Sequence, residues 1–152
     1  MTKQEQAAAL RNDPNTHYNC AQSVVAAFLD QLNLEKDQAM AIAGGFGGGI
    51  GSSRAEVCGA VSGAVMVLSL LNPHTDGADK EGKKQVYAIA KEFHQRYADA
   101  FGGLTRCGDL LKARPSVNEK TQAAARLGIT AHCDVMIVTA VEIVEAMLAE
   151  RG

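Results

Sequence analysis

The sequence predicts an all-α protein, a single-domain bundle of about six to eight helices. Helix-capping patterns recur (Ser or Thr with Glu three residues later), apolar residues repeat every three or four positions, and no stretch alternates apolar with polar residues as a half-buried strand would. A chain of 152 residues buries about two-thirds of its unfolded surface when it folds, so it needs no disulfide bonds. We therefore expect residues 1–152 to form one helical domain.

The part of the chain before residue 44 contains three expected helices, over residues 2–11, 20–32 and 35–43. Thr2 and Glu5 form the capping pattern that opens the first helix, which is rich in alanine. Asn19 is a suitable cap for the second helix, in which apolar residues return with helical spacing.

A glycine tract, residues 44–51, precedes the longest uncharged run of the sequence, residues 57–71. Ser53 and Glu56 form a second capping pattern, so we expect an apolar helix that begins near Ser53 and ends at Asn72. The uncharged run is shorter than the ~20 residues that a membrane-spanning helix needs. We therefore expect a buried central helix after a glycine-rich loop, and a protein that is not embedded in a membrane.

One strip of the apolar helix consists of small residues, namely Gly59, Ala60, Gly63 and Ala64. Because these residues have little or no side chain, another helix backbone can approach the strip closely. Strips of this kind often mark close helix pairing, so we expect the protein to form a homodimer.

Four further helices are expected in the second half of the chain, over residues 79–101, 105–114 and 116–128 and from residue 130 onward. Gly102 and Gly103 close the first of them, as glycine commonly does after a helix. Ser116 and Glu119 form a third capping pattern. Thr130 is the expected cap of the last helix.

All four cysteines, Cys20, Cys58, Cys107 and Cys133, lie at or just inside the start of an expected helix. The exposed N–H groups at a helix start carry about half a positive charge, which favours a nearby anion. A thiol at such a position loses its proton more easily, and the thiolate is both the nucleophile and the metal ligand. The shared position therefore indicates a metal or redox site built where helix starts converge.

The spacing of the cysteines selects among the sites that they could form. No two of them are close in the sequence, which argues against a zinc finger, a thioredoxin-like pair and covalent c-type haem attachment. An iron–sulfur cluster requires four cysteines but no particular spacing. The leading hypothesis is therefore a redox protein that binds such a cluster for electron transfer or sensing. Such a protein would exchange electrons with a redox partner protein.

Two alternatives remain open beside the cluster. The first is a metal-free thiol enzyme or switch in which cysteines form reversible disulfides. The second is a helical interaction module whose cysteines are structural, because free cysteines are often buried as small hydrophobic residues.

Two histidines lie next to cysteines in the sequence: His17 is one turn before Cys20, and His132 adjoins Cys133. Either histidine could be a further ligand, or a base that increases the thiolate fraction. Neighbouring residues on a helix point about 100° apart, so His132 and Cys133 do not easily share one target. We expect both histidines to be surface or capping residues.

The glycine tract does not fit a nucleotide-binding loop. It lacks the Lys that ends a P-loop, it does not contain Gly-x-Gly-x-x-Gly, and no expected strand precedes it. Its backbone amides could instead wrap around something small or negatively charged, at Gly47, Gly48, Gly49 and Gly51. A tight packing loop between two helices is an equal alternative.

The net charge and the first residues of the chain indicate which partners and which cellular compartment to expect. The formal net charge of −2 gives no electrostatic reason to expect nucleic acid or an anionic membrane as a partner. The first residues, MTKQEQAAAL, lack the order of a signal peptide. We therefore expect a cytoplasmic protein, and because structural disulfides are rare there, metal binding or redox chemistry is the favoured use of the cysteines.

The segment Cys58-Gly59-Ala60-Val61-Ser62-Gly63 matches the CGAxxG signature of the C_GCAxxG_C_C family, whose members are described as redox-active. Tyr18-Asn19-Cys20-Ala21-Gln22 resembles the first cysteine segment of that family, and Cys107 and Cys133 fit its third and fourth. The resemblance implies a helical protein in which the four cysteines are the functional set. A related segment occurs in the split-Soret cytochromes, dimeric haem proteins to which an iron–sulfur centre is also attributed. This chain lacks their haem-attachment motifs, so haem is not implied.

Overall fold

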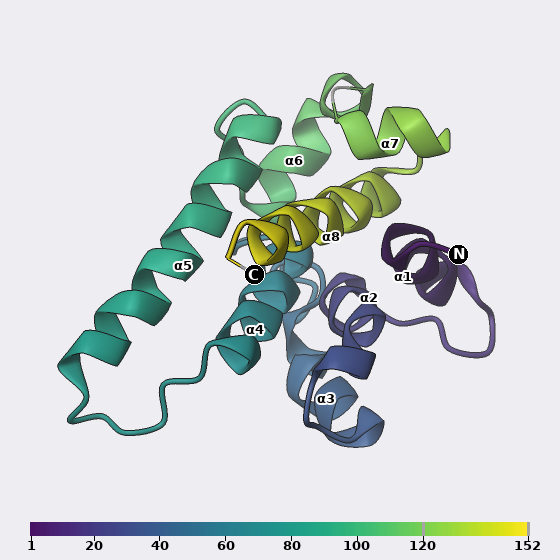
Figure 1. Cartoon of the computed structure of the whole chain (residues 1–152). Coiled ribbons are helices and arrows are strands. Elements are labelled where there is room, and N and C mark those ends of the chain that lie inside the picture. Colours follow the sequence, from purple (N-terminus) through teal and green to yellow (C-terminus); the bar gives the residue numbers. More distant parts are fainter. Residues whose placement is uncertain (120, 152) are drawn as a thin grey trace.

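A computed structural model of the chain describes residues 1–119 and 121–151 and shows eight α-helices in this part of the chain (Figure 1). The helices are α1 (Lys3–Asn12), α2 (Cys20–Ala27), α3 (Lys36–Ala43), α4 (Gly59–Leu71), α5 (Lys80–Ala100), α6 (Cys107–Ala113), α7 (Gln122–Leu127) and α8 (His132–Arg151). No strand occurs among the described residues, and the only ladder pairing there is one isolated antiparallel bridge between Val57 and Arg106. The prediction of an all-α bundle is confirmed.

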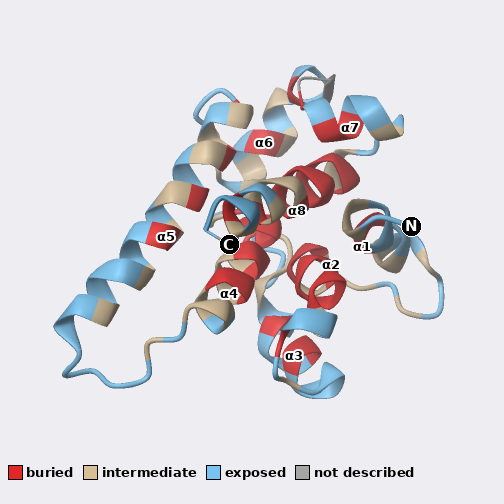
Figure 2. Cartoon of the chain, viewed as in Figure 1, coloured by how far each residue is buried: buried red, intermediate tan, exposed pale blue. Residues whose placement is uncertain are grey.

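Helix α8 runs through the middle of the molecule, and α1, α2, α4, α5 and α7 all pack against it (Figure 1). Every residue from Asp134 to Val141 is buried, as expected of a helix that is apolar on all sides and enclosed by other helices. Buried residues gather on α8, α4 and α2, whereas the N-terminal end of α5 is mostly exposed (Figure 2). Across the described chain, none of the helices combines the length and the apolar character needed to cross a membrane.

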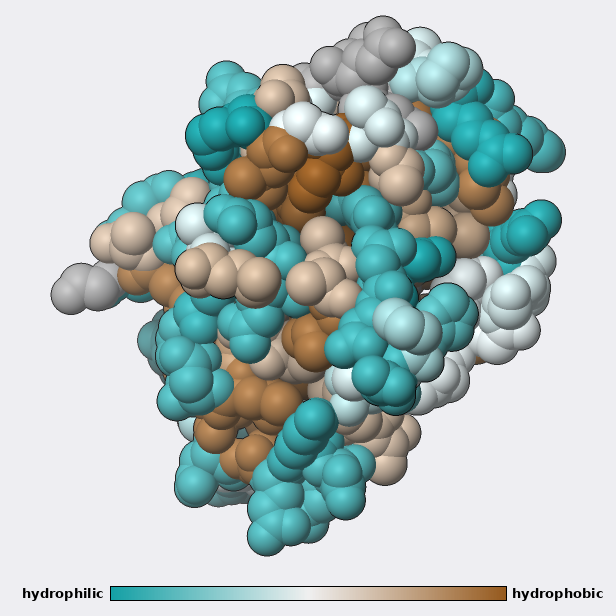
Figure 3. All heavy atoms as spheres, turned by 90° about the vertical axis from the view of Figure 1, so that its right-hand side faces the viewer, coloured by the Kyte–Doolittle hydropathy of each residue, from teal (hydrophilic) through white to brown (hydrophobic). Residues whose placement is uncertain are grey.

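The strip of small residues on α4 faces α2 of the same chain. A Cβ atom built on Gly63 would lie 2.6 Å from the carbonyl oxygen of Ala21, and one on Gly59 would lie 3.0 Å from that of Phe46. The prediction of close helix approach is therefore correct, but the partner is intramolecular. The homodimer prediction loses this basis and stays a prediction. On the side of the molecule where α1 lies, hydrophobic residues form separate patches divided by hydrophilic ones (Figure 3).

We expect Gly63→Ala to lower the free energy of unfolding by about 2 kcal/mol, because the added methyl must push α2 away from α4. Alanine is the better helix former by about 1 kcal/mol, and overpacking against a backbone carbonyl outweighs that gain. Urea unfolding followed by circular dichroism measures the change. Gly45→Ala is the matched control, since a Cβ atom there meets nothing within 4 Å. Equal stabilities of the two variants would show that α2 and α4 do not pack this closely.

Local capping patterns are confirmed at some helix starts. The side chain of Thr2 accepts a hydrogen bond from the N–H of Glu5 at the start of α1. Asn19 caps α2 in the same way and forms a complete capping box with Gln22. Helix α2 is shorter than expected, because it ends at Ala27 and the chain continues as a separate short 3₁₀ helix over Leu29–Gln31.

The prediction that a helix begins near Ser53 is wrong, because α4 begins at Gly59 with Cys58 as its N-cap residue. The hydroxyl of Ser53 is engaged elsewhere: it donates to the carbonyl oxygen of Gly49 at 2.6 Å and accepts from the N–H of Ala55. These bonds hold the glycine-rich loop together, so the residue that reads as a helix cap in the sequence stabilises a loop.

The third capping pattern is also misplaced. Helix α7 begins at Gln122, and its cap is Thr121, whose side chain accepts from the N–H of Ala124. Ser116–Glu119 forms a separate short 3₁₀ helix, and the hydroxyl of Ser116 donates to the carbonyl oxygen of Ala113. The role expected of the Glu119 side chain lies outside the described residues.

Candidate functional site

The four cysteines occupy corresponding positions at four different helices. Cys20 is the first residue of α2, Cys58 is the N-cap of α4, Cys107 is the first residue of α6, and Cys133 is the second residue of α8. All four border one small cavity of about 40 Å³. The remaining lining of that cavity includes Leu110, Leu111, Met136 and His132. The structure therefore brings together the whole set of cysteines that the sequence singled out.

The isolated bridge between Val57 and Arg106 places the starts of α4 and α6 side by side. The N–H of Cys58 donates to the carbonyl oxygen of Thr105 at 2.8 Å, and the N–H of Cys107 donates to that of Glu56 at 3.0 Å. These backbone bonds fix two cysteines that are far apart in the sequence. The positions of Cys58 and Cys107 are thus set by the backbone and not by their side chains.

The glycine tract forms a left-handed turn against the cysteine cavity. Residues 48–52 all have positive φ, including the non-glycine residues Ile50 and Ser52, a conformation that costs such residues about 1 kcal/mol or more each. A Cβ atom on Gly49 would lie 2.8 Å from the Cβ of Cys107, and one on Gly47 would lie 2.6 Å from the Cβ of Asn19. The loop therefore packs tightly between the starts of α2 and α6.

Among the four cysteines, Cys20 and Cys133 influence each other's pKa most strongly. The interaction between the two side chains lowers the pKa of Cys133 and raises that of Cys20. Burial opposes ionisation of Cys133, whereas the positive charge of Arg11 favours it, and the net result is a pKa of about 6. The surroundings of Cys133, with Arg11 beside it, therefore favour its thiolate form, and those of Cys20 favour the thiol.

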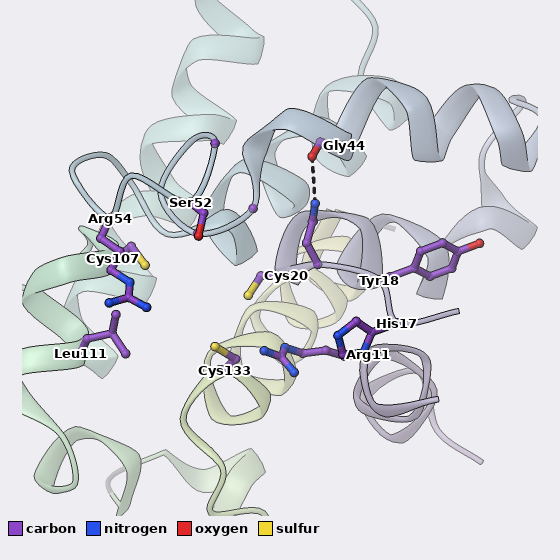
Figure 4. A pocket seen from close by; sticks show the side chains of 14 residues that line it. Arg11, His17, Tyr18, Cys20, Gly44, Ser52, Arg54, Cys107, Leu111 and Cys133 are labelled. Carbon is purple, nitrogen blue, oxygen red and sulfur yellow. Dashed lines mark hydrogen bonds between the residues drawn. The ribbon is translucent and has the colours of Figure 1, made fainter. Parts of the chain in front are cut away.

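Arg11, in the last turn of α1, lies beside Cys133 with its guanidinium group directed at the sulfur (Figure 4). Burial alone would lower the pKa of Arg11, but its interactions with Cys133 and Cys20 raise it. The Nε atom of Arg11 is buried and has no hydrogen-bond partner among the described residues. Arg11 is therefore a cation held at the site with donor capacity to spare.

Cys58 and Cys107 remain protonated thiols. Complete burial raises the pKa of Cys58 to about 11, against the smaller lowering effect of the nearby Tyr97 hydroxyl. That hydroxyl is itself buried and makes no hydrogen bond of normal length within the described part of the chain. Burial likewise raises the pKa of Cys107, which is half-buried. Cys133 is thus the one cysteine at the cavity whose surroundings favour the thiolate.

An open cleft of about 470 Å³ leads to the pair Cys20 and Cys133 (Figure 4). Its volume lies within the usual range for small-molecule sites, about 300–1,000 Å³. The cleft is lined by Arg11, His17, Tyr18, Asn19, Cys20, Gly44, Gly47, Gly48, Gly51, Ser52, Arg54, Cys107, Leu111 and Cys133. The cysteine cavity and the cleft share Cys20, Cys107 and Cys133, so a molecule in the cleft reaches the sulfurs from outside.

The two histidines near the cysteines take different places. His17 lines the cleft with a left-handed backbone at φ 46°. His132 is half-buried and borders the cysteine cavity, where burial and then the charge of Arg114 lower its pKa. His132 is therefore part of the wall of the cavity, which a surface or capping role does not describe.

Three residues of the site had no assigned role in the sequence. No sequence pattern indicates that Arg11 or Arg54 belongs to the site, because their neighbours in the sequence do not show that α1 and the loop before α4 meet at the cysteines. Tyr97 carried a signal for burial: together with Phe93 and Phe101 it repeats every fourth residue on one face of α5, and the three rings pack together.

The four cysteines are the candidate metal ligands of the site. No group of three His, Cys, Asp or Glu side chains in the described chain is arranged to hold a single metal ion. In an iron–sulfur cluster each iron takes its own cysteine, so the four sulfurs need to surround a volume and not to meet at a point. The four cysteines match an iron–sulfur cluster in the number and kind of ligands only, and among the described residues they do not form a site for a mononuclear ion.

The fold and the site define a small all-α protein in which free cysteines from four helix starts meet beneath an open cleft. The chain belongs to the family described as "Putative redox-active protein (C_GCAxxG_C_C)", whose family model matches residues 18–147. The match includes all four cysteines and confirms the resemblance seen in the sequence. No curated protein and no solved structure matches the chain.

Proposed function

We propose that this protein is a thiol-based redox protein in which Cys133 and Cys20 form a reversible disulfide. The observation that carries the proposal is that Cys20 and Cys133 lie next to each other where they line the cleft, with the guanidinium group of Arg11 beside them (Figure 4). A thiolate next to a second thiol is the arrangement that thiol–disulfide exchange requires. Membership of a redox-active family supports the same conclusion.

Cys133 is the attacking nucleophile in this proposal. Its thiolate attacks one sulfur of a disulfide substrate, forms a mixed disulfide, and releases the other half of the substrate as a thiolate. Cys20 then gives its proton to the departing thiolate and attacks the Cys133 sulfur, which releases the second half of the substrate as a thiolate that takes its proton from water. Two electrons pass from the protein pair to the substrate, and the Cys20–Cys133 disulfide remains. A dithiol donor returns the pair to its reduced form by the same exchange.

Mild oxidation tests the assignment of the pair. Treating the reduced protein with one equivalent of a small disulfide should lower its mass by two hydrogens. Proteolysis without reduction should then yield one cross-linked fragment that contains Cys20 and Cys133. A cross-link between any other two cysteines, or no cross-link at all, would contradict the proposed pair.

A four-cysteine iron–sulfur cluster is the second candidate function, and the observation that favours it is the shared cavity bordered by all four sulfurs. Cys20, Cys58, Cys107 and Cys133 would hold the cluster, and the cluster would supply one-electron transfer. The cavity of about 40 Å³ has room for about one water molecule. The helices would have to separate slightly to admit a cluster, which is why the disulfide is the stronger proposal.

A double variant separates the two candidates. Cys58→Ala with Cys107→Ala leaves the proposed disulfide pair in place but removes two of the four cluster ligands. The thiol proposal predicts that this variant still forms the Cys20–Cys133 disulfide. If the wild-type protein purified anaerobically is coloured and contains iron and sulfide, and the double variant loses all three, the cluster is the correct assignment.

The proposal also includes the cellular setting expected from the sequence. A cytoplasmic location would keep the pair reduced between reactions, in accordance with four free cysteines. The redox partner would then be the dithiol donor that resets the pair. Sedimentation of the purified protein tests the homodimer, which none of the contacts within this chain requires.

A further inference from the structure

The cleft above Cys20 and Cys133 is lined by two arginines and by no carboxylate of the described residues. Arg11 stands on the side of Cys133, and Arg54 lies beside Cys107 and Leu111 (Figure 4). His17 also lines the cleft, and no Asp or Glu of the described residues does so. The nearby carboxylate of Asp134 is buried and accepts a hydrogen bond from Asn12 at 2.8 Å, so it is engaged away from the cleft.

Arg54 has a strained backbone conformation that the surrounding loop holds in place. Its φ is 64°, a left-handed conformation that glycine adopts freely and arginine does not. The backbone is held on both sides: its N–H donates to the carbonyl oxygen of Gly48, and its carbonyl oxygen accepts from the N–H of Gly108, each at 2.8 Å. The fold therefore holds an arginine at the rim of the cleft where a glycine would be easier to accommodate.

We propose that the cleft binds a small disulfide that carries a negatively charged group, such as a carboxylate, near its sulfur atoms. The inference rests on the proposed function and names the substrate class of the same site. Arg54 and the guanidinium group of Arg11, which both line the cleft, would bind the anionic group, and the substrate sulfur would lie against Cys133. The cleft of about 470 Å³ suits a small molecule better than a protein surface.

The electron balance is that of the proposed exchange: the substrate disulfide gains two electrons and leaves as one thiol, which carries the proton of Cys20, and one thiolate, which water protonates, while Cys20 and Cys133 become a disulfide. The anionic group does not react. Its contribution is orientation and attraction, because a charge held by Arg54 places the adjacent sulfur in reach of the thiolate. Arg54 is therefore a positioning residue.

Three aliphatic disulfides of similar size test the charge preference: dithiodipropionate (dianionic), hydroxyethyl disulfide (uncharged) and cystamine (dicationic). Each is mixed with reduced protein, the reaction is quenched with iodoacetamide, and mass spectrometry follows the formation of the protein disulfide. We expect the dianionic probe to react about tenfold faster than the uncharged one, and cystamine to react more slowly than either. High salt should reduce the preference.

Variants of Arg54 identify the source of the preference. Arg54→Gly should lower the ratio of the dianionic to the uncharged rate about fivefold and keep the melting temperature, because glycine suits φ 64°. Arg54→Lys should retain most of the preference. Arg126→Gln is the matched control: it also removes one positive charge, but Arg126 does not line the cleft and pairs with Glu142.

The outcomes separate the inference from the proposed function. If all three probes react quickly through Cys133 at equal rates, the disulfide pair is real and the anionic substrate class is wrong. The same conclusion follows if Arg126→Gln changes the preference as much as Arg54→Gly does. If no probe forms the Cys20–Cys133 disulfide, the proposed function fails and the inference fails with it.

Discussion

Replacing Cys133 by Ser is expected to lower the rate of reaction with small disulfides by at least about 100-fold, because the thiolate is the nucleophile and a serine hydroxyl does not ionise near neutral pH. Cys133 is the one cysteine whose surroundings lower its pKa, and Cys20, Cys58 and Cys107 have raised pKa values. The measurement is the rate of loss of free thiols under a small excess of disulfide at pH 7.

Cys20→Ser provides the matched variant for this prediction. It keeps the nucleophile and a hydroxyl donor next to it, but it removes the sulfur that resolves the mixed disulfide. We expect the first reaction to proceed and the mixed disulfide at Cys133 to accumulate, which intact mass spectrometry detects. If Cys133→Ser reacts as fast as the wild-type protein, the nucleophile is another cysteine.

The helices could be predicted from the sequence wherever a local pattern decides the structure. Thr2 and Asn19 cap their helices because the groups they bond lie three residues away in the chain. Ser53 has the same pattern around it, but its hydroxyl bonds to Gly49 in the preceding loop. That loop is shaped by contacts with α2 and α6, and such contacts are invisible in a local pattern.

The site was predictable to the extent that it depends on helix starts. Four cysteines at helix starts indicate convergence, and all four do border one cavity. The pairing of Cys20 with Cys133, and the presence of Arg11 beside them, depend on how α1 and α2 pack on α8. The small-residue strip on α4 shows the same limit: its spacing predicts a close helix, but only the fold shows that the helix is α2.

The pH dependence of Cys133 reactivity is the second large expected effect. Because the thiolate reacts and the thiol does not, the rate of alkylation by iodoacetamide should rise as the pH increases through about 6 and then level off. An ordinary cysteine would instead gain reactivity up to about pH 8.5. Alkylation rates measured across this range, with Cys133 identified by peptide mass, test the prediction.

Three variants of the surroundings should move this midpoint in directions fixed by charge. Cys20→Ala removes the interaction that does most to lower the pKa of Cys133, and Arg11→Gln removes the nearby positive charge, so both should raise that pKa. Asp134→Asn removes a negative charge that opposes ionisation, so it should lower the pKa. Opposite shifts from Arg11→Gln and Asp134→Asn can come only from electrostatics, since simple loosening of the fold would move both variants toward the unfolded value. If all three variants keep the same pH midpoint of alkylation, Cys20, Arg11 and Asp134 do not control the ionisation of Cys133.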